Sequence, residues 1–155
     1  MRISSLIVLL LPLFCYSQNR GNIWTFGHNA AIDFNSSQPV ADSSKVRSRG
    51  SCVSISDVSG NLLFYAFTRA GVFGNSALIY DRTHQQMQNG DNILGEGWYH
   101  ELVIIPQPGS DSLYYLFCIG VTGSSTPGIF YSKIDLSANG GLGAVIQKNV
   151  QLPNY

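Results

Sequence analysis

Three histidines and nine carboxylates are the side chains that could carry acid–base or metal chemistry in this chain of 155 residues. His100 and Glu101 are adjacent at the start of an expected strand, whereas a zinc-binding helix needs a second His four residues on, where this chain has isoleucine. His84 lies in a polar loop and His28 in an expected turn, so we expect both to order the backbone. The histidine spacing therefore predicts no metal site and no general base.

The remaining signatures of catalysis are also missing from the sequence. No serine stands in a Gly-x-Ser-x-Gly elbow. The Gly-rich stretches at 123–125 and 139–143 precede no helix that could hold a phosphate, so they are interpreted as turns, with Gly140 and Gly141 structural. The chain is therefore predicted not to be an enzyme and to need no cofactor.

Two aspartates occupy turns rich in Gly and Ser. Asp57 precedes Gly60 in one turn, and Asp111 follows a Pro-Gly-Ser run in another. Neither has a second carboxylate at the close spacing of a calcium loop. We expect Asp57, Gly60 and Asp111 to shape turns, because an Asp side chain readily bonds the backbone two residues on.

Exposed aromatic residues remain as candidates for binding. Trp98 and Tyr99 lie in "GEGWYH", an expected loop between repeats, and could stack on a surface glycan or contact a partner protein. Trp24 lies in an alternating run and is expected in the core instead. Binding is thus assigned speculatively to Trp98 and Tyr99.

The elements that would position these residues are short strands, because no stretch shows a convincing helical period. Alternating or apolar runs bounded by turn residues predict strands, with a polar connection from Asn35 to about Gly50. The predicted strands cover the runs NIWTFG, AAIDF, CVSISD, LLFYAF, ALIYD, ELVIIP, LYYLFCI, GIFYSKIDL and the C-terminal run that ends in VQL.

One pattern occurs twice. "SDVSGNLLFYAF" and "PGSDSLYYLFCI" each join a turn to an aromatic strand, at an offset of about 51 residues. Repeats of this size with three or four antiparallel strands are typical of β-propeller blades. We predict an all-β, antiparallel, propeller-like fold of about two blades in an incomplete ring, with a β-sandwich as the alternative. The open sheet edges predict possible self-association.

The first seventeen residues are predicted to be a secretory signal peptide. Arg2 precedes an apolar run that ends at Phe14 and is too short to span a bilayer. Cleavage after Ser17 would leave a domain of residues 18–155 with no membrane-spanning segment. Acylation of Cys15 in a lipoprotein is the alternative. Both readings predict export.

Net charge and cysteine content bear on the partners of the chain and on its disulfide bonding. The formal net charge is +0, which argues against a nucleic-acid partner. Cys52 and Cys118 lie in apolar strands and are expected to be two separate buried thiols. A disulfide between them, permitted by export, remains the alternative.

Long motifs in the chain resemble a known family. "GNIWTFGHNAAIDF" is similar to an "NxWxFGxxAGxDF" phrase, and Cys52–Tyr65 is similar to "CxSISDxxGNLLFY". Pro106–Phe117 matches "PxPGxxxxYYxF", and Tyr131–Asn149 matches "YSxIDLSxNGGLGxVxxKN" almost throughout. The next family phrase contains a Trp that this chain lacks, although His84 and the Met-x-Asn-Gly that follows it are kept.

These phrases resemble the start of large secreted proteins of Bacteroidota that usually carry a C-terminal sorting domain for type IX secretion. The resemblance implies a propeller-like region, export to the cell surface or medium, and a longer parent protein of which this chain is a fragment. A periplasmic location is expected if no sorting domain is present. We therefore expect a non-enzymatic surface interaction or adhesion module. A glycan-binding or glycan-hydrolysing propeller with active residues in missing blades is the alternative.

Overall fold

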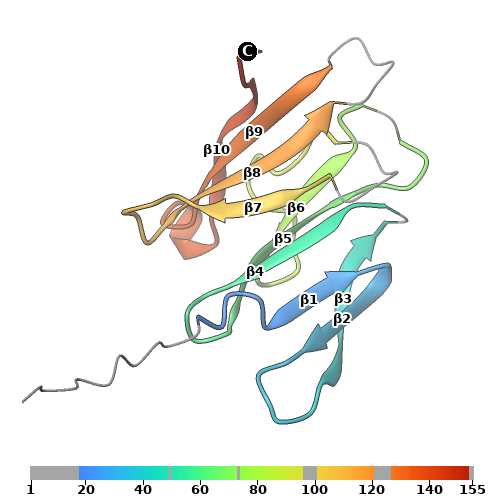
Figure 1. The fold of residues 1–155 in the computed structure, drawn as a ribbon, viewed down its shortest axis with the longest axis vertical. Helices are drawn as coiled ribbons and strands as arrows, with labels where there is room; N and C mark the ends of the chain where they lie inside the picture. The colour runs from blue at the N-terminus through green and yellow to red at the C-terminus, as the bar shows by residue number, and fades with distance from the viewer. Residues whose placement is uncertain (1–17, 49, 73, 96–100, 121–126, 154–155) are drawn as a thin grey trace, which may run out of the picture.

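The computed structural model describes residues 18–48, 50–72, 74–95, 101–120 and 127–153, and strands dominate them (Figure 1). The prediction of an all-β chain is confirmed. The elements are β1 (Ile23–Phe26), β2 (His28–Asp33), β3 (Val40–Arg47), β4 (Cys52–Ser56), β5 (Leu62–Thr68), β6 (Ala77–Asp81), β7 (Val103–Pro106), β8 (Leu113–Gly120), β9 (Gly128–Asp135), the 3-10 turn η1 (Asn139–Gly141) and β10 (Ala144–Gln151).

The strands form three antiparallel sheets, and none of them closes on itself. The first sheet has the order β1-β2-β3, the middle sheet β4-β5-β6, and the last sheet β10-β9-β8-β7. Every sheet joins strands that follow one another in the chain, as expected for short connections. The repeat noticed in the sequence corresponds to the hairpins β4–β5 and β7–β8, in which Ile55 opposes Phe64 and Ile105 opposes Tyr115.

The prediction of a polar connection across residues 35–50 is wrong where β3 runs. Six of the eight β3 residues are exposed, so the strand has almost no apolar alternation for a sequence pattern to detect. Only Ser44 and Val46 are buried, and the Ser44 hydroxyl donates to the carbonyl of Ala30 on β2 at 2.9 Å. This extra strand widens the β1–β2 hairpin into a sheet of three strands.

The main core lies between the middle and last sheets. Its buried side chains come from both sheets, and the Phe64 and Tyr114 rings meet nearly at right angles with centroids 5.5 Å apart. Cys118 belongs to this core and is fully buried. The two sheets therefore exclude water from each other's facing sides.

A second, smaller core lies on the opposite side of the middle sheet. Val46 of β3 packs there with Tyr65 and Phe67 of β5, and all three are buried. Half-buried Leu78 and Tyr80 of β6 pack against them. The first sheet thus covers part of the outer side of the middle sheet through β3.

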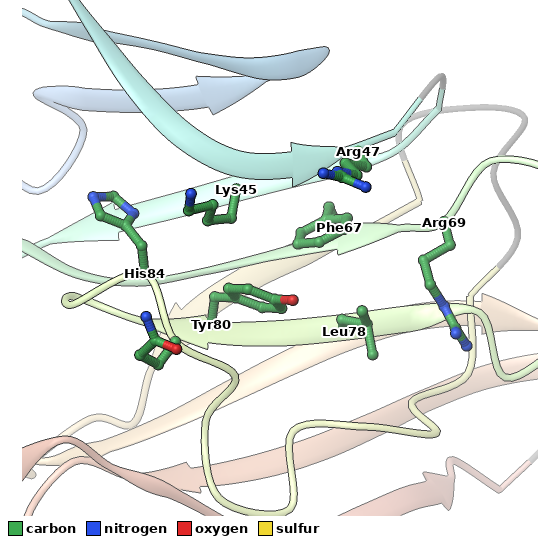
Figure 2. Close-up of a pocket in the computed structure, with 8 residues that line it drawn as sticks. Lys45, Arg47, Phe67, Arg69, Leu78, Tyr80 and His84 are labelled. Atoms are coloured by element: carbon green, nitrogen blue, oxygen red, sulfur yellow. The ribbon is translucent and has the colours of Figure 1, made fainter.

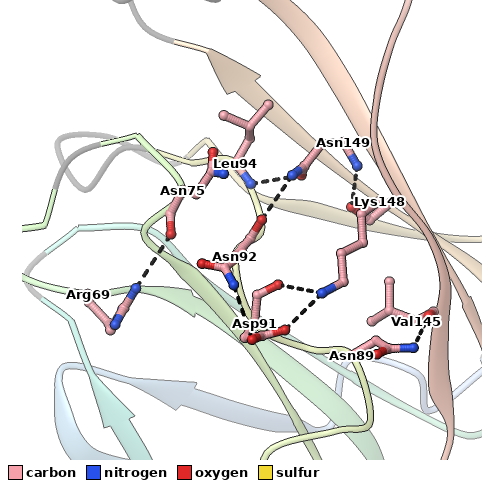
Figure 3. A network of polar contacts seen from close by, with 10 residues as sticks. Arg69, Asn75, Asn89, Asp91, Asn92, Leu94, Val145, Lys148 and Asn149 are labelled. Atoms are coloured by element: carbon pink, nitrogen blue, oxygen red, sulfur yellow. Dashed lines mark hydrogen bonds and ion pairs between the residues drawn. The ribbon is translucent and has the colours of Figure 1, made fainter.

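The segment after β6 is fixed to the far edge of the last sheet by polar contacts (Figure 3). Asn149 on β10 accepts from the Leu94 N–H at 2.9 Å and donates to the Asn92 carbonyl at 2.9 Å. Lys148 pairs with Asp91 at 2.8 Å. These contacts join the middle and last sheets at their margins as well as through the core.

Two expectations about single residues have different outcomes. Trp24 was expected in the core, but 56% of it is exposed; its Nε1–H donates to the Gly21 carbonyl and its ring centroid lies 5.2 Å from that of Phe34. Its side of β1 faces outward, because the adjacent Thr25 takes the buried side. Cys52 and Cys118 are both free thiols, as expected; Cys118 is buried, whereas Cys52 is only partly buried.

Candidate functional site

The two aromatic residues singled out for binding, Trp98 and Tyr99, lie outside the described residues, as does His100. The candidate site is therefore built from the parts of the chain that the structure describes.

The turn residue Asp57 uses its carboxylate locally. Its Oδ1 accepts the Ser59 and Asn61 N–H groups at 2.8 and 2.9 Å, and its Oδ2 accepts the Asn61 side-chain amide at 2.9 Å. The hydrogen bond from the Asn61 side-chain amide is the main reason that the pKa of Asp57 lies below its ordinary value. Gly60 has a φ of 93°, and a Cβ there would lie 1.9 Å from the Asn35 side-chain oxygen. The carboxylate stabilises its own turn.

The remaining predicted turn residues are Asp111, Gly140 and Gly141. In the turn before β8, the Ser110 hydroxyl accepts the Ser112 and Leu113 N–H groups, and among the described residues Asp111 makes no hydrogen bond. Gly140 and Gly141, in η1 between β9 and β10, have φ values of 63° and 84°, which an L side chain adopts only with strain. A ligand role has no geometric support at these positions.

A basic groove lies over the outer side of the middle sheet (Figure 2). Its volume is about 330 Å³, within the range of small-molecule sites. Its lining combines cationic and aromatic side chains: Lys45, Arg47, Phe67, Arg69, Leu78, Tyr80, His84 and Gln85.

One wall of the basic groove comes from β3. Ser44 and Val46 are buried beneath the strand, so Lys45 and Arg47 are exposed. Residues two apart on a strand lie on one side, about 7 Å from each other. The alternation therefore places two cations in a row along the groove.

The floor of the basic groove comes from β5 and β6. Phe67 opposes Leu78 across the two strands. The Phe67 and Tyr80 ring centroids are 5.3 Å apart with a 52° angle between the ring planes. Phe67 itself is only 2% exposed, so the accessible part of the floor is formed by Leu78 and Tyr80.

The hydroxyl of Tyr65 links β3 to the loop that follows β6. The Tyr65 hydroxyl accepts the Lys45 backbone N–H at 3.1 Å and lies 3.2 Å from Nδ1 of His84. The direction of the Tyr65–His84 hydrogen bond depends on which imidazole nitrogen carries the proton. Burial raises the pKa of Tyr65 to about 12. Tyr65 thus fixes the spacing of β3 and the loop after β6.

Arg69 and Arg47 extend the basic groove into a neighbouring cavity. Arg69 donates from Nε to the Ser76 carbonyl at 3.1 Å and from Nη2 to the Asn75 carbonyl at 3.5 Å. Both arginines also line a second hollow of about 590 Å³ that includes His28. His28 opposes Arg47 across β2 and β3. The cationic lining therefore runs past the first cavity.

The acidic side chain closest in sequence to His84 is used by its own loop. Asp81 is buried, and its Oδ1 accepts the Thr83 N–H and hydroxyl at 2.7 and 2.6 Å and the Gln85 N–H at 3.3 Å. These bonds shape the loop in which His84 has a φ of 61°. Within the described segments, the ion pair between Lys148 and Asp91 lies elsewhere, and Lys45 and Arg47 pair with no acid. The groove thus concentrates uncompensated positive charge in a chain of net charge zero.

Comparisons with protein-family models, curated proteins and solved structures found no match to this chain. Within the described residues, no cluster of three or more His, Cys, Asp or Glu could hold a metal ion, and no helix could cross a membrane. The groove must therefore be interpreted from its own geometry.

The sequence-based reading missed the basic groove because its walls are far apart along the chain. The signal that could have found one wall is "SSKVR", in which Lys45 and Arg47 alternate with Ser44 and Val46. That alternation has meaning only if the stretch is a strand, and it was interpreted as a connection. The contributions of Arg69 and His84 depend on packing and could not be found from local pattern.

Proposed function

We propose that this chain is a non-enzymatic interaction module of an exported protein, and that it holds an anionic ligand in the basic groove. The observation that carries the proposal is the convergence of Lys45, Arg47, Arg69 and His84 on the aromatic floor, with no acid among the described lining residues. Cations that lack a protein counter-ion attract anions strongly where an apolar floor excludes part of the water.

A binding role explains this groove better than a reaction. Its described lining contains no carboxylate, cysteine or serine that could act as a nucleophile or as one of a pair of acids. Hydrolysis of a glycan would need two carboxylates at defined separation. We therefore keep the glycan-hydrolysing alternative only for a longer parent protein.

Export and a propeller-like architecture belong to the same proposal. The leader-like first seventeen residues and the resemblance to secreted Bacteroidota proteins support export to the surface or medium. The matching registers of β4–β5 and β7–β8 support a repeated sheet unit. N-terminal sequencing of protein recovered from the medium of a Bacteroidota host should find Gln18 first. An intact Met1 would contradict export by cleavage, and a lipid-modified Cys15 would favour the lipoprotein alternative.

The groove is tested by charge reversal with a matched control. Arg47→Glu and Lys133→Glu change the net charge equally, but Lys133 lies on β9, outside the groove. On a sulfonated cation-exchange resin, Arg47→Glu should elute at clearly lower salt than the control, since clustered cations retain a polyanion better than dispersed ones. Equal elution of the two variants would show that only total charge matters and would reject the groove as the site.

A further inference from the structure

We infer that the ligand of the basic groove is an acidic saccharide, with its sugar ring against Leu78 and Tyr80 and its acid group against Arg47 and Arg69. This inference rests on the proposed function, and it names the ligand class. It follows from three features of the groove: the floor, the cations, and the state of the backbone along both walls.

The floor favours a puckered ring over a flat one. Leu78 and Tyr80 lie two apart on β6 and are partly buried, so they present a short surface, part aliphatic and part aromatic, beside the buried Phe67 ring. A pyranose has an apolar C–H side and a polar rim, and it can lie on such a surface while its hydroxyl groups stay solvated. A nucleobase gains most from stacking on accessible aromatic faces, and Tyr80 is the one floor aromatic that the described lining leaves even partly accessible.

The cations are placed for acid groups on the rim of that ring. Arg69 uses Nε and Nη2 on backbone carbonyls, and its Nη1 makes no hydrogen bond within the described structure. Arg47 makes no side-chain hydrogen bond to any described residue. A guanidinium matches a carboxylate or sulfate with two donors. Both arginines therefore have donors available beside the aromatic floor.

The walls exclude an extended acidic peptide as the preferred ligand. Such a peptide would add as a strand and bond the edge backbone. On β3, the N–H groups of Lys45 and Val46 are already bonded to the Tyr65 and Ser44 hydroxyls. On β6, Ile79 and Asp81 donate to the carbonyls of Gly90 and Gln85. Strand addition would break these bonds, whereas a saccharide needs only side chains.

The groove is long enough for more than one sugar. Arg47 and Arg69 line both the 330 Å³ cavity and the neighbouring cavity of about 590 Å³. A second unit would lie toward His28. A charged oligosaccharide should therefore bind more tightly than its monomer.

Isothermal titration calorimetry of the purified protein tests the inference with defined probes. The probes are oligogalacturonate, dextran sulfate, neutral dextran oligosaccharide, poly-L-glutamate and a single-stranded DNA oligonucleotide. We expect oligogalacturonate or dextran sulfate to bind in a salt-sensitive way, and the stronger of the two identifies the acid group as carboxylate or sulfate. Neutral dextran should not bind measurably.

Variants locate the binding. Arg47→Gln and Lys45→Gln change exposed side chains and should each weaken saccharide binding about tenfold, whereas Lys133→Gln on the last sheet should not. Tyr80→Ala should weaken binding, and Tyr131→Ala, which changes another partly buried tyrosine on the last sheet, should leave it unchanged. Thermal unfolding of each variant checks its fold, and the two exposed glutamine variants remain informative if Tyr80→Ala unfolds.

The outcomes separate the inference from the proposed function. If poly-L-glutamate or DNA binds as tightly as the saccharides and Arg47→Gln weakens it, the saccharide inference is wrong while the anion-binding groove stands. If none of the anionic probes binds, both are wrong. If saccharides bind equally well to Arg47→Gln, the site lies elsewhere and both are again rejected.

Discussion

The outer sides of the middle and last sheets carry similar aromatic clusters, but only one of them is covered. On the middle sheet, Tyr65 and Phe67 are buried under β3, and Tyr80 packs against them. On the last sheet, the Tyr115, Phe117 and Tyr131 rings lie with centroids 5.5–6.2 Å apart, yet all three are only partly buried. A cluster that is covered in one sheet is thus open to solvent in the other.

The open side continues across β7, β8 and β9 of the last sheet. Val103 opposes Phe117, and Ile119 opposes Ile129, so these four share one side of the sheet. Val103, Ile119 and Ile129 are 50%, 46% and 49% exposed. Contiguous apolar surface of this kind is uncommon on monomers. The comparison teaches that the cover, and not the aromatic cluster itself, creates the groove: β3 contributes both the lid on Tyr65 and the cations Lys45 and Arg47.

The strongest way to break the comparison is to remove one aromatic side chain from each side. Tyr65→Ala deletes a fully buried ring and should lower the free energy of unfolding by about 3–5 kcal/mol. Tyr115→Ala removes a partly buried ring at the surface and should cost about 1 kcal/mol. Urea unfolding followed by fluorescence measures both. Equal losses would mean that the last sheet is covered in solution.

The second largest effect is expected at high pH, which should destabilise the fold through Tyr65 on the covered side. Burial is the main cause that raises the pKa of Tyr65 to about 12, from 10.0 in an exposed chain. As the pH rises, Tyr65 therefore loses its proton in the unfolded chain before it does so in the folded chain. The free energy of unfolding that depends on this proton is fully present below pH 10 and declines as the pH rises toward 12. Urea midpoints across this range measure the decline. A Tyr65→Phe variant with the same slope as the parent would assign the effect to other groups.

Removing only the hydroxyl groups gives a smaller contrast. Tyr65→Phe leaves the Lys45 N–H without its acceptor and should cost about 1–2 kcal/mol. Tyr115 donates from its hydroxyl to Gln107 at 3.0 Å near the surface, so Tyr115→Phe should cost about 0.5 kcal/mol or less. Hydrogen exchange at the Lys45 amide should accelerate only in the first variant. If it does not, β3 is held by other contacts.

The smallest effect is expected from the cation on the open side. Lys133 Nζ lies 5.6 Å from the centre of the Tyr115 ring. Lys133→Gln should reduce stability by about 0.5 kcal/mol, as for an exposed cation–π pair. Repeating the measurement in Tyr115→Leu gives the coupling between the two residues. A coupling of zero would show that the lysine is simply solvated.

Local pattern was sufficient to predict the hairpins of the middle and last sheets. Turn residues such as Asp57 and Gly60, followed by apolar strands, have a direct backbone meaning. The same method missed β3, since its exposed residues follow no apolar period. It also misplaced Trp24, because alternation identifies two sides of a strand but not which of them is buried. The groove depends on the presence of β3 and on which side of that strand is buried. Neither could be decided from local pattern, so the groove could not be predicted from the sequence.

The thiol of Cys118 lies fully buried between the middle and last sheets, and burial raises its pKa to about 12. A thiol that is neither ionised nor reachable reacts with an oxidant only while the sheets are apart. In an oxidising medium, the fraction of protein in which Cys118 is oxidised would therefore rise with storage time. That fraction would measure the average total time for which the two sheets have been separated.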